Sequence, residues 1–158
     1  SENSIGVKAI TLIDNRWSRP DIKTTQLLPN VLAKTEANNK GAFEGIFIDT
    51  NGYVTEGSSS NIWIINHENE IITRAIDGQI LSGITRKSIA QFAQLNNLLV
   101  KEKKFKKEEL YKSKEVFLTS ASSFVTPIIE IDNIKINDGK VGQMSVELRK
   151  LYFKNFAI

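Results

Sequence analysis

Three short polar segments of this sequence carry side chains that could do chemistry. One contains Lys23, one covers residues 56 to 61, and one covers residues 82 to 86. Each stands between two segments that are expected to form helices or strands. Loops held by such rigid elements are where binding and catalytic residues concentrate, so these three segments are the first candidates for a functional site.

The segment around Lys23 offers a candidate nucleophile. A lysine attacks as the free amine, and an apolar wall or a neighbouring cation favours that form. Ile22 and Leu27 could supply the wall, and Arg16 and Arg19 the positive charge. A loop lysine is more often a solvated surface charge, so the residue types alone leave both interpretations open.

The second segment, residues 56 to 61, joins the carboxylate of Glu56 to a turn that contains three serines. The carboxylate could hold a ring nitrogen, while hydroxyl and backbone N–H groups bind oxyanions. An ordinary hydrophilic turn has the same composition. The segment is therefore a candidate binding site whose function needs a second signal.

The third segment, residues 82 to 86, stands where a helix is expected to begin. Unpaired N–H groups and the helix dipole attract phosphate at such a position, and Gly83 allows close approach of the backbone. Simple N-capping explains the same residues. A further hydroxyl cluster at residues 119 to 123 follows a predicted strand and is either another anion-binding turn or only a turn.

The composition excludes several classes of site. The chain has 158 residues, of which 41% are hydrophobic and 25% charged, which is enough to bury the core of one domain. It has no cysteine, and His67 is its one histidine. Thiolate and histidine-cluster metal sites and a Cys/His nucleophile pair are therefore excluded, and base chemistry is left to carboxylates, lysines and tyrosines.

Charge and hydropathy limit the expected partners. The net charge is only +3, and the basic residues from 101 to 107 are interleaved with glutamates rather than forming an unbroken patch. Nucleic acid is not expected, because phosphate-tracking surfaces need clustered Lys and Arg. No apolar run is long enough to cross a bilayer and the start has no signal-peptide pattern. We therefore expect no membrane partner and a cytoplasmic location.

Apolar periodicity predicts an α+β, or mixed α/β, fold rather than a doubly wound one. Strands are predicted at residues 7–13, 43–50, 53–55, 62–65, 71–72, 99–105, 116–119 and 125–131. Helices are predicted at residues 26–40, from about 80 to 97, 107–112 and 142–156. Asn51-Gly52 is a strong hairpin signal, and a second hairpin is expected with its tip at residues 66 to 69.

Helical spacing also predicts the buried helix faces. The first helix should be capped by Thr24 or Thr25 and end at Gly41. Its apolar positions at helical spacing are Leu27, Leu28, Val31, Leu32 and Ala37. For the two later long helices the expected buried residues are Ile89, Phe92, Ala93, Leu95, Met144, Leu148, Leu151 and Tyr152.

Taken in order, these segments resemble the class IV (fold type IV) pyridoxal-phosphate enzymes, which include D-amino-acid aminotransferases, branched-chain aminotransferases and aminodeoxychorismate lyases. The resemblance runs from about Gly6 to Phe156. It rests on R-W-S-R-P-D-I-K-T at 16–24, N-V-L-A-K at 30–34, G-Y-V-T-E-G-S-S-S-N at 52–61, I-L-S-G-I-T-R at 80–86 and V-T-P-I-I-E-I at 125–131. The E-G-S-S-S-N stretch is similar to the D-amino-acid version, whereas Ala121 and Phe124 depart from it.

The resemblance implies pyridoxal 5'-phosphate as cofactor, carried by the catalytic Lys23 as a Schiff base. It implies that Glu56 pairs with the pyridine nitrogen and that Leu81 packs on the ring. Ile84 and Thr85 would hold the phosphate with help from the turn at residues 120–122. The residues expected to bind the cofactor are Glu56, Ser60, Leu81, Gly83, Ile84, Thr85, Ser120, Ala121 and Ser122; no metal is expected.

The resemblance also implies an antiparallel-rich sheet or barrel-like core flanked by helices. Residues 1–158 would be a single cofactor-binding C-terminal domain, without the smaller N-terminal domain that family members carry. Because the chain does not begin with Met, we interpret it as a processed chain or a fragment. Family members are homodimers, so a homodimer is expected.

The activity implied is transamination between a D-amino acid, D-alanine in the first place, and a 2-oxo acid such as 2-oxoglutarate. Within the family the alternatives are a branched-chain aminotransferase and an aminodeoxychorismate lyase, which would use the same lysine to eliminate. Outside enzymology, the chain could be an inactive isolated domain that serves as a binding or dimerisation module, or a generic binding domain without cofactor.

Overall fold

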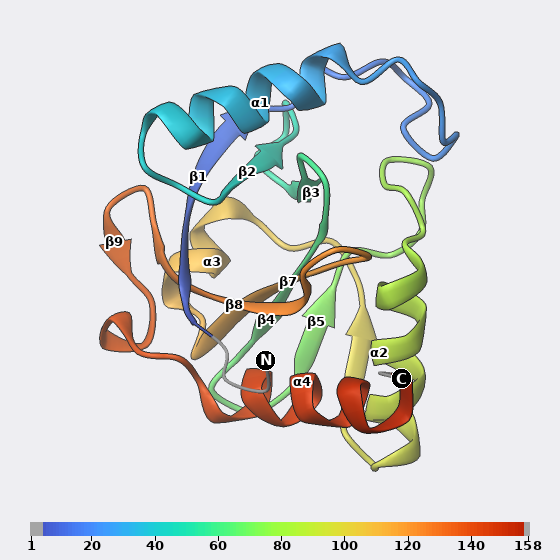
Figure 1. Cartoon of the computed structure of the whole chain (residues 1–158), viewed down its shortest axis with the longest axis vertical. Helices are drawn as coiled ribbons and strands as arrows, with labels where there is room; N and C mark the ends of the chain where they lie inside the picture. The colour runs from blue at the N-terminus through green and yellow to red at the C-terminus, as the bar shows by residue number, and fades with distance from the viewer. Residues whose placement is uncertain (1–4, 157–158) are drawn as a thin grey trace.

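The computed structural model describes residues 5–156, which form one curled sheet flanked by helices (Figure 1). The strands are β1 (Val7–Ile13), β2 (Glu44–Ile48), β3 (Val54–Gly57), β4 (Asn61–Ile65), β5 (Ile71–Thr73), β6 (Val100–Glu102), β7 (Glu115–Ser120), β8 (Phe124–Ile131) and β9 (Ile134–Lys135). The helices are α1 (Leu28–Asn39), α2 (Ile84–Leu95), α3 (Lys107–Lys112) and α4 (Gln143–Phe156), with a 3-10 turn at Asn137–Gly139.

The sheet is mixed and curls toward a barrel. Its strand order is β3-β2-β1-β8-β7-β4-β5-β6, with β9 paired to β8. Only the pairs β1–β2, β1–β8 and β5–β6 are parallel among the described strands. The two ends of this order also meet, because Val54 N donates to Phe105 O and Lys107 N to Gly52 O, both at 3.0 Å. The predicted antiparallel-rich, barrel-like α+β core is confirmed.

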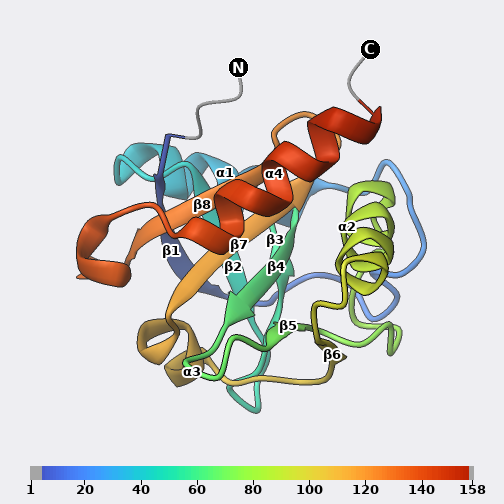
Figure 2. The ribbon, with the colours of Figure 1, turned by 90° about the horizontal axis from the view of Figure 1, so that it is seen from below.

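The core has two large parts, one on each face of the sheet, and a small third cluster of Ile10, Ala37 and Ala42 under α1. In β4, Ile62 and Ile64 point into the interior of the curled sheet, while Trp63 and Ile65 point outward. This is the two-residue alternation of a strand that is buried on both faces. The outward set packs against α2 and α4, and Figure 2 shows α4 crossing β7 and β8. Among residues 5–156, no helix combines the length and the apolar character that crossing a membrane needs.

The buried face of α1 differs from the predicted one. The leucine positions are exposed, with Leu28 67% accessible and Leu32 56%; of the predicted set only Ala37 is buried, together with Ala33, which was not predicted. The reason is a close approach to β2, since a Cβ added at Gly45 would lie 3.2 Å from the Ala33 carbonyl oxygen. Only small residues fit such an approach, so the leucines that helical spacing predicted to be buried lie on a different face of the helix.

Several other helix and strand boundaries differ from the predicted ones. α1 begins only at Leu28, and Thr24 accepts a bond from Gln26 N inside the preceding loop instead of capping the helix. In α2, Ile89 and Ala93 are buried as predicted, but Leu95 is 70% exposed. The strand predicted at 99–105 shrinks to β6, and the two-residue β9 was not predicted. Gly41, with φ of +70°, ends α1 as expected.

Candidate functional site

One cleft brings together three of the residues expected to bind a cofactor. It lies between the loop that follows β1, the start of α1, β3 and the segment ahead of α2. Lys23, Glu56 and Leu81 all line it. The other lining residues are Arg16, Trp17, Pro20, Ile22, Thr24, Gln26, Leu27 and Asn30. Residues far apart in the sequence therefore converge on one surface, as the motif order suggested.

Backbone hydrogen bonds within the loop that carries Lys23 stabilise its turns. Ile22 N donates to Arg19 O at 3.0 Å and Leu27 N to Thr25 O at 2.9 Å. Lys23 itself is exposed, and Ile22 and Leu27 line the same cleft but are 43% and 50% exposed, so they do not enclose the lysine as the predicted apolar wall. Arg19, however, pairs with the adjacent Asp21, so it does not act as the bare cation that we expected near the lysine.

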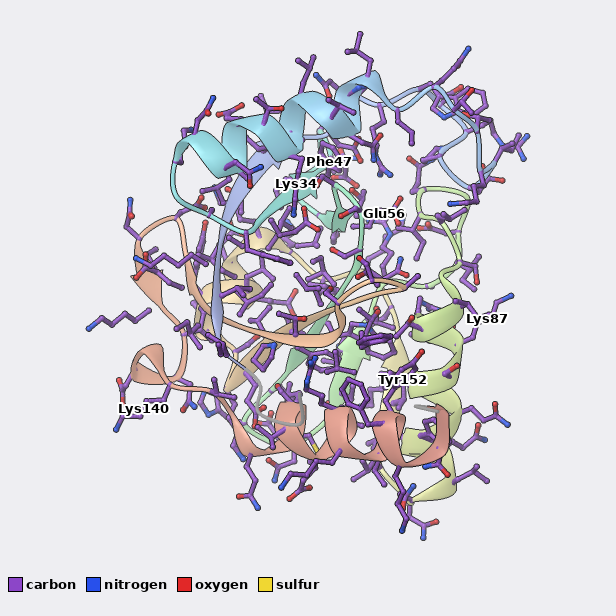
Figure 3. All side chains as sticks on the ribbon, viewed as in Figure 1. Lys34, Phe47, Glu56, Lys87, Lys140 and Tyr152 are labelled. Carbon is purple, nitrogen blue, oxygen red and sulfur yellow. The ribbon has the colours of Figure 1, made fainter. Side chains whose placement is uncertain are left out.

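Glu56 is the buried carboxylate of the cleft. It lies inside the molecule, while Lys87 and Lys140 point outward (Figure 3). Its oxygens accept hydrogen bonds from Arg16 Nη1, from Asn61 Nδ2 at 3.2 Å and from Leu81 N at 3.1 Å. Burial raises the pKa of Glu56 to about 7, although the positive charge of Arg16 opposes the shift.

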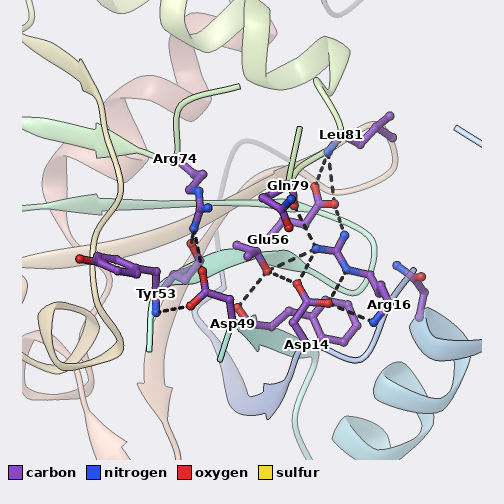
Figure 4. Close-up of polar contacts among 12 residues, drawn as sticks. Asp14, Arg16, Asp49, Tyr53, Glu56, Arg74, Gln79 and Leu81 are labelled. Atoms are coloured by element: carbon purple, nitrogen blue, oxygen red, sulfur yellow. Dashed lines mark hydrogen bonds and ion pairs between the residues drawn. The ribbon is translucent and has the colours of Figure 1, made fainter. Parts of the chain in front are cut away.

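Arg16 is the second charged group of the cleft, and it does not face Lys23 as a free cation. Its guanidinium bridges Glu56 and Asp14, and it also donates to Thr55 Oγ1 and Gln79 O (Figure 4). The backbone of Asp14 is also fixed, because Asp14 N donates to Ile48 O at 2.8 Å and so continues the pairing of β1 with β2. Asp14, which directly follows the strand predicted at residues 7–13, was not among the residues expected at the site.

The serine hydroxyls of the second segment do not face the cleft. Ser58, Ser59 and Ser60 all donate to the buried carboxylate of Glu44. A hydroxyl has one proton to donate, so these groups are not free for the oxyanion that we expected them to bind. Ser60, expected to bind cofactor, lies behind the cleft and fixes the turn. Glu44, at the start of β2, was another residue that the sequence analysis missed.

The third segment lies at the other end of the site, beyond Leu81. Asn61 joins the two ends, because its Nδ2 donates to both Glu56 and Leu81 O. Thr85 is buried and donates to Ser120 O at 3.0 Å, which brings the start of α2 beside the turn at residues 120–122. The Ile84 side chain, Ala121 and Ser122 are exposed there. The structure therefore brings Gly83, Ile84 and Thr85 together with Ser120, Ala121 and Ser122.

We expect Gly83→Ala to lower the free energy of unfolding by about 1–3 kcal/mol, the usual cost of overpacking. A Cβ at Gly83 would lie 2.5 Å from Asn61 Oδ1, while its φ of −64° suits any residue. Urea unfolding measures the loss. In the double variant with Asn61→Ala the clash is gone, so adding Gly83→Ala to Asn61→Ala should cost little. An equal loss in both backgrounds contradicts the steric explanation.

Comparison with known proteins supports the resemblance. The family described as amino-transferase class IV matches residues 2–131. D-alanine aminotransferase of Bacillus licheniformis is 42% identical over 144 residues, which cover 91% of this chain and 50% of the relative. That of Staphylococcus aureus (strain N315) is 43% identical over 149 residues, which cover 94% and 52%. The chain thus spans about half the length of the curated relatives it matches.

Solved structures with a similar fold include branched-chain amino acid aminotransferases. The Escherichia coli enzyme superposes with a TM-score of 0.85 at 27% identity, covering 99% of this chain and 54% of that one. The enzyme of Thermobaculum terrenum, solved in its PLP form, has a TM-score of 0.87 at 28% identity and covers 98% and 52%. The fold, the order of the motifs and the sequence identity all indicate the same family.

Proposed function

Because the chain belongs to the class IV aminotransferases, we propose that it is the cofactor-holding domain of an enzyme that transfers amino groups between a D-amino acid and a 2-oxo acid. D-Alanine and 2-oxoglutarate are the proposed pair. The observation that carries the proposal is that Lys23 and Glu56, from two distant segments, line one cleft. The curated relatives above are D-alanine aminotransferases, which favours that amino acid.

The charges of the cleft suit pyridoxal 5'-phosphate. Two carboxylates, Asp14 and Glu56, meet one guanidinium, that of Arg16, so the cluster has a net charge of −1 when all three are ionised. The raised pKa of Glu56 indicates that its burial is not fully offset by positive charge. A protonated ring nitrogen would provide that charge. The amine of Lys23 in the same cleft is the group that an aldehyde requires.

When bound, the cofactor supplies an electron sink for the negative charge that develops at the substrate's Cα. Lys23 Nζ would hold the cofactor covalently, and its free amine would be the base for the proton at Cα. Glu56 would place its negative charge at the ring nitrogen and so keep that nitrogen protonated. Leu81, on the cleft wall, would provide the apolar contact for the ring.

The phosphate is proposed to bind at the start of α2. The first N–H groups of a helix have no partner within it, and the helix dipole favours an anion there. Gly83, Ile84 and Thr85 provide this helix start, and the turn of Ser120, Ala121 and Ser122 lies against it through the Thr85 bond. Ser60 supports the site indirectly, because its hydroxyl serves Glu44.

The remaining walls of the pocket are proposed to come from protein segments outside this chain. A second copy in a homodimer is proposed as well. The relatives are about twice as long as the matched segment. The apolar stripe on α1, which includes Leu28, Val31 and Leu32, is exposed and lies next to the cleft residue Leu27. An apolar strip of this kind is typical of a covered surface.

A substrate panel tests the proposed reaction. The protein produced from its complete coding frame and loaded with pyridoxal 5'-phosphate should convert D-alanine and 2-oxoglutarate at least about tenfold faster than L-leucine and 2-oxoglutarate. Coupled pyruvate detection follows the first pair. Preference for L-leucine supports the branched-chain alternative, which the solved neighbours favour. Pyruvate release from aminodeoxychorismate without an amino acceptor supports the lyase.

A further inference from the structure

We infer that Asp14 and Arg16 are positioning residues for Glu56, and that together they set the charge that the cleft presents to a ring nitrogen. Arg16 fixes the place of the Glu56 carboxylate, and Asp14 keeps the cluster of three at a net charge of −1. The inference rests on the proposed function for its meaning, but the contacts that carry it are independent of any cofactor.

The contacts hold the Arg16 guanidinium on all its edges. Nε and Nη2 donate to the two oxygens of Asp14 at 2.9 and 2.8 Å, and Nη1 donates to Glu56. Its flat face lies 4.8 Å from the centre of the Phe47 ring. Because its side chain is only 4% exposed, the arginine cannot rotate away without leaving a buried carboxylate alone.

Asp14 is held as firmly as the arginine. Thr55 Oγ1 donates to Asp14 Oδ2 at 2.7 Å, and the Arg16 N–H donates to Oδ1 at 3.2 Å. The pKa of Asp14 lies below its ordinary value: burial raises it, but the hydrogen bonds and charge of Arg16 lower it more. Asp14 therefore stays ionised at neutral pH. Thr55 precedes Glu56 on β3, so one strand carries both partners.

Few charges face Glu56 within the part of the chain that the structure describes. Arg16 and Asp14 approach from the end of β1, and Lys23 lines the same cleft from the loop. The segment ahead of α2 contributes an uncharged N–H group, that of Leu81. Arg74, which donates to Val54 O on β3, is neutralised by its own partners Asp49 and Asp77. Arg16 is thus the charge in direct contact with Glu56, and Asp14 acts on Glu56 by charge repulsion and through the Arg16 bridge.

Removing the charge of Arg16 and removing the charge of Asp14 should shift the pKa of Glu56 in opposite directions. Without Arg16 two carboxylates would share one buried place, and like charges in such a site raise the pKa of one of them. Without the charge of Asp14 the Arg16–Glu56 pair would be neutral. The carboxyl of Glu56 would then ionise more readily, but the cluster would no longer carry the surplus negative charge that attracts a cation.

The test measures the titration of Glu56 directly, in the protein without cofactor, by NMR of ¹³C-labelled glutamate carboxyls. The Glu56 signal, assigned by its loss in Glu56→Gln, should titrate near pH 7. We expect Asp14→Asn to lower its midpoint by about 1 pH unit and Arg16→Gln to raise it by about 1–3 units. Arg16→Lys should lie between Arg16→Gln and the unmodified protein.

Arg19→Gln is the matched control, because Arg19 lies on the same loop and makes an equally short ion pair, at 2.7 Å with Asp21, but outside the cleft. It should leave the Glu56 midpoint where it was. If Arg16→Gln does not fold, Asp14→Asn and Arg16→Lys decide. Midpoints in Asp14→Asn and Arg16→Lys that equal that of the unmodified protein overturn the inference.

Cofactor binding separates this inference from the proposed function. Asp14→Asn should weaken binding of pyridoxal 5'-phosphate about tenfold, followed by absorbance at a fixed pH of about 8, whereas Arg19→Gln should bind like the unmodified protein. If the unmodified protein does not bind the cofactor, the proposed function fails, and the carboxyl titration still decides on the charge cluster. If it binds and Asp14→Asn binds equally well, the charge cluster does not serve the cofactor.

Discussion

Lys23→Ala will abolish transamination, with a loss of more than about 10⁴-fold, because the residue supplies both the covalent attachment and the base. The protein with pyridoxal 5'-phosphate should show an absorption band near the edge of the visible range. Borohydride should remove that band and leave a label on Lys23. The variant should show neither the band nor the label, even where it still binds the cofactor without a covalent bond.

Lys87→Ala is the control for a change of one lysine. Lys87 lies on α2, near the proposed phosphate end, but its side chain points away from the body of the protein (Figure 3). It should keep the band, the label on Lys23 and the turnover. A label on a different lysine in the unmodified protein, or turnover in Lys23→Ala, contradicts the assignment.

Glu56→Gln should retain the cofactor but transaminate about 10²–10³-fold more slowly, which is the scale of losing one preorganised electrostatic contact. Glutamine has the same shape and can still accept from Leu81 N and Arg16. It lacks the negative charge that keeps the ring nitrogen protonated. Measuring kcat and cofactor affinity separately distinguishes this loss from a failure to bind, and unchanged kcat refutes the role.

Glu115→Gln controls for the loss of a buried carboxylate as such. Glu115 is equally buried, but it accepts from Met144 N and Ser145 N at the start of α4, outside the cleft. We expect the variant to unfold more easily through that lost cap, whereas the folded protein should turn over normally. Slow turnover of folded Glu115→Gln would mean that the effect of Glu56→Gln is not specific.

The same substitution at Glu56 has a consequence for stability. The ordinary pKa of Glu56 is 4.5, and in the folded protein it rises to about 7. Between these values the folded state holds a proton that the unfolded state has lost, so stability falls as pH rises. Relative to Glu56→Gln, the unmodified protein without cofactor should lose on the order of 3 kcal/mol between pH 4.5 and about 7. Urea unfolding at several pH values measures this difference.

Local patterns predicted most elements because each strand alternates or runs apolar within a few residues. β4 and β5 were predicted from Ile62 to Ile65 and from Ile71 and Ile72, with the turn between them. The buried face of α1 was not predictable in this way. Its leucines have the right spacing for a core, but what lies over the helix is decided by Gly45 on a neighbouring strand.

The residue types and motif order by themselves determined the family, and they proposed Lys23 and Glu56 as the amine and the carboxylate that a bound cofactor would require. Only the tertiary structure decided which charges surround them. Arg16 was expected to place its positive charge near Lys23, but it bridges Asp14 and Glu56. The serine hydroxyls were expected to bind an oxyanion, but they donate to Glu44. Hydrogen bonds between side chains depend on how distant strands come into register, and that arrangement is set by packing rather than by spacing along the chain.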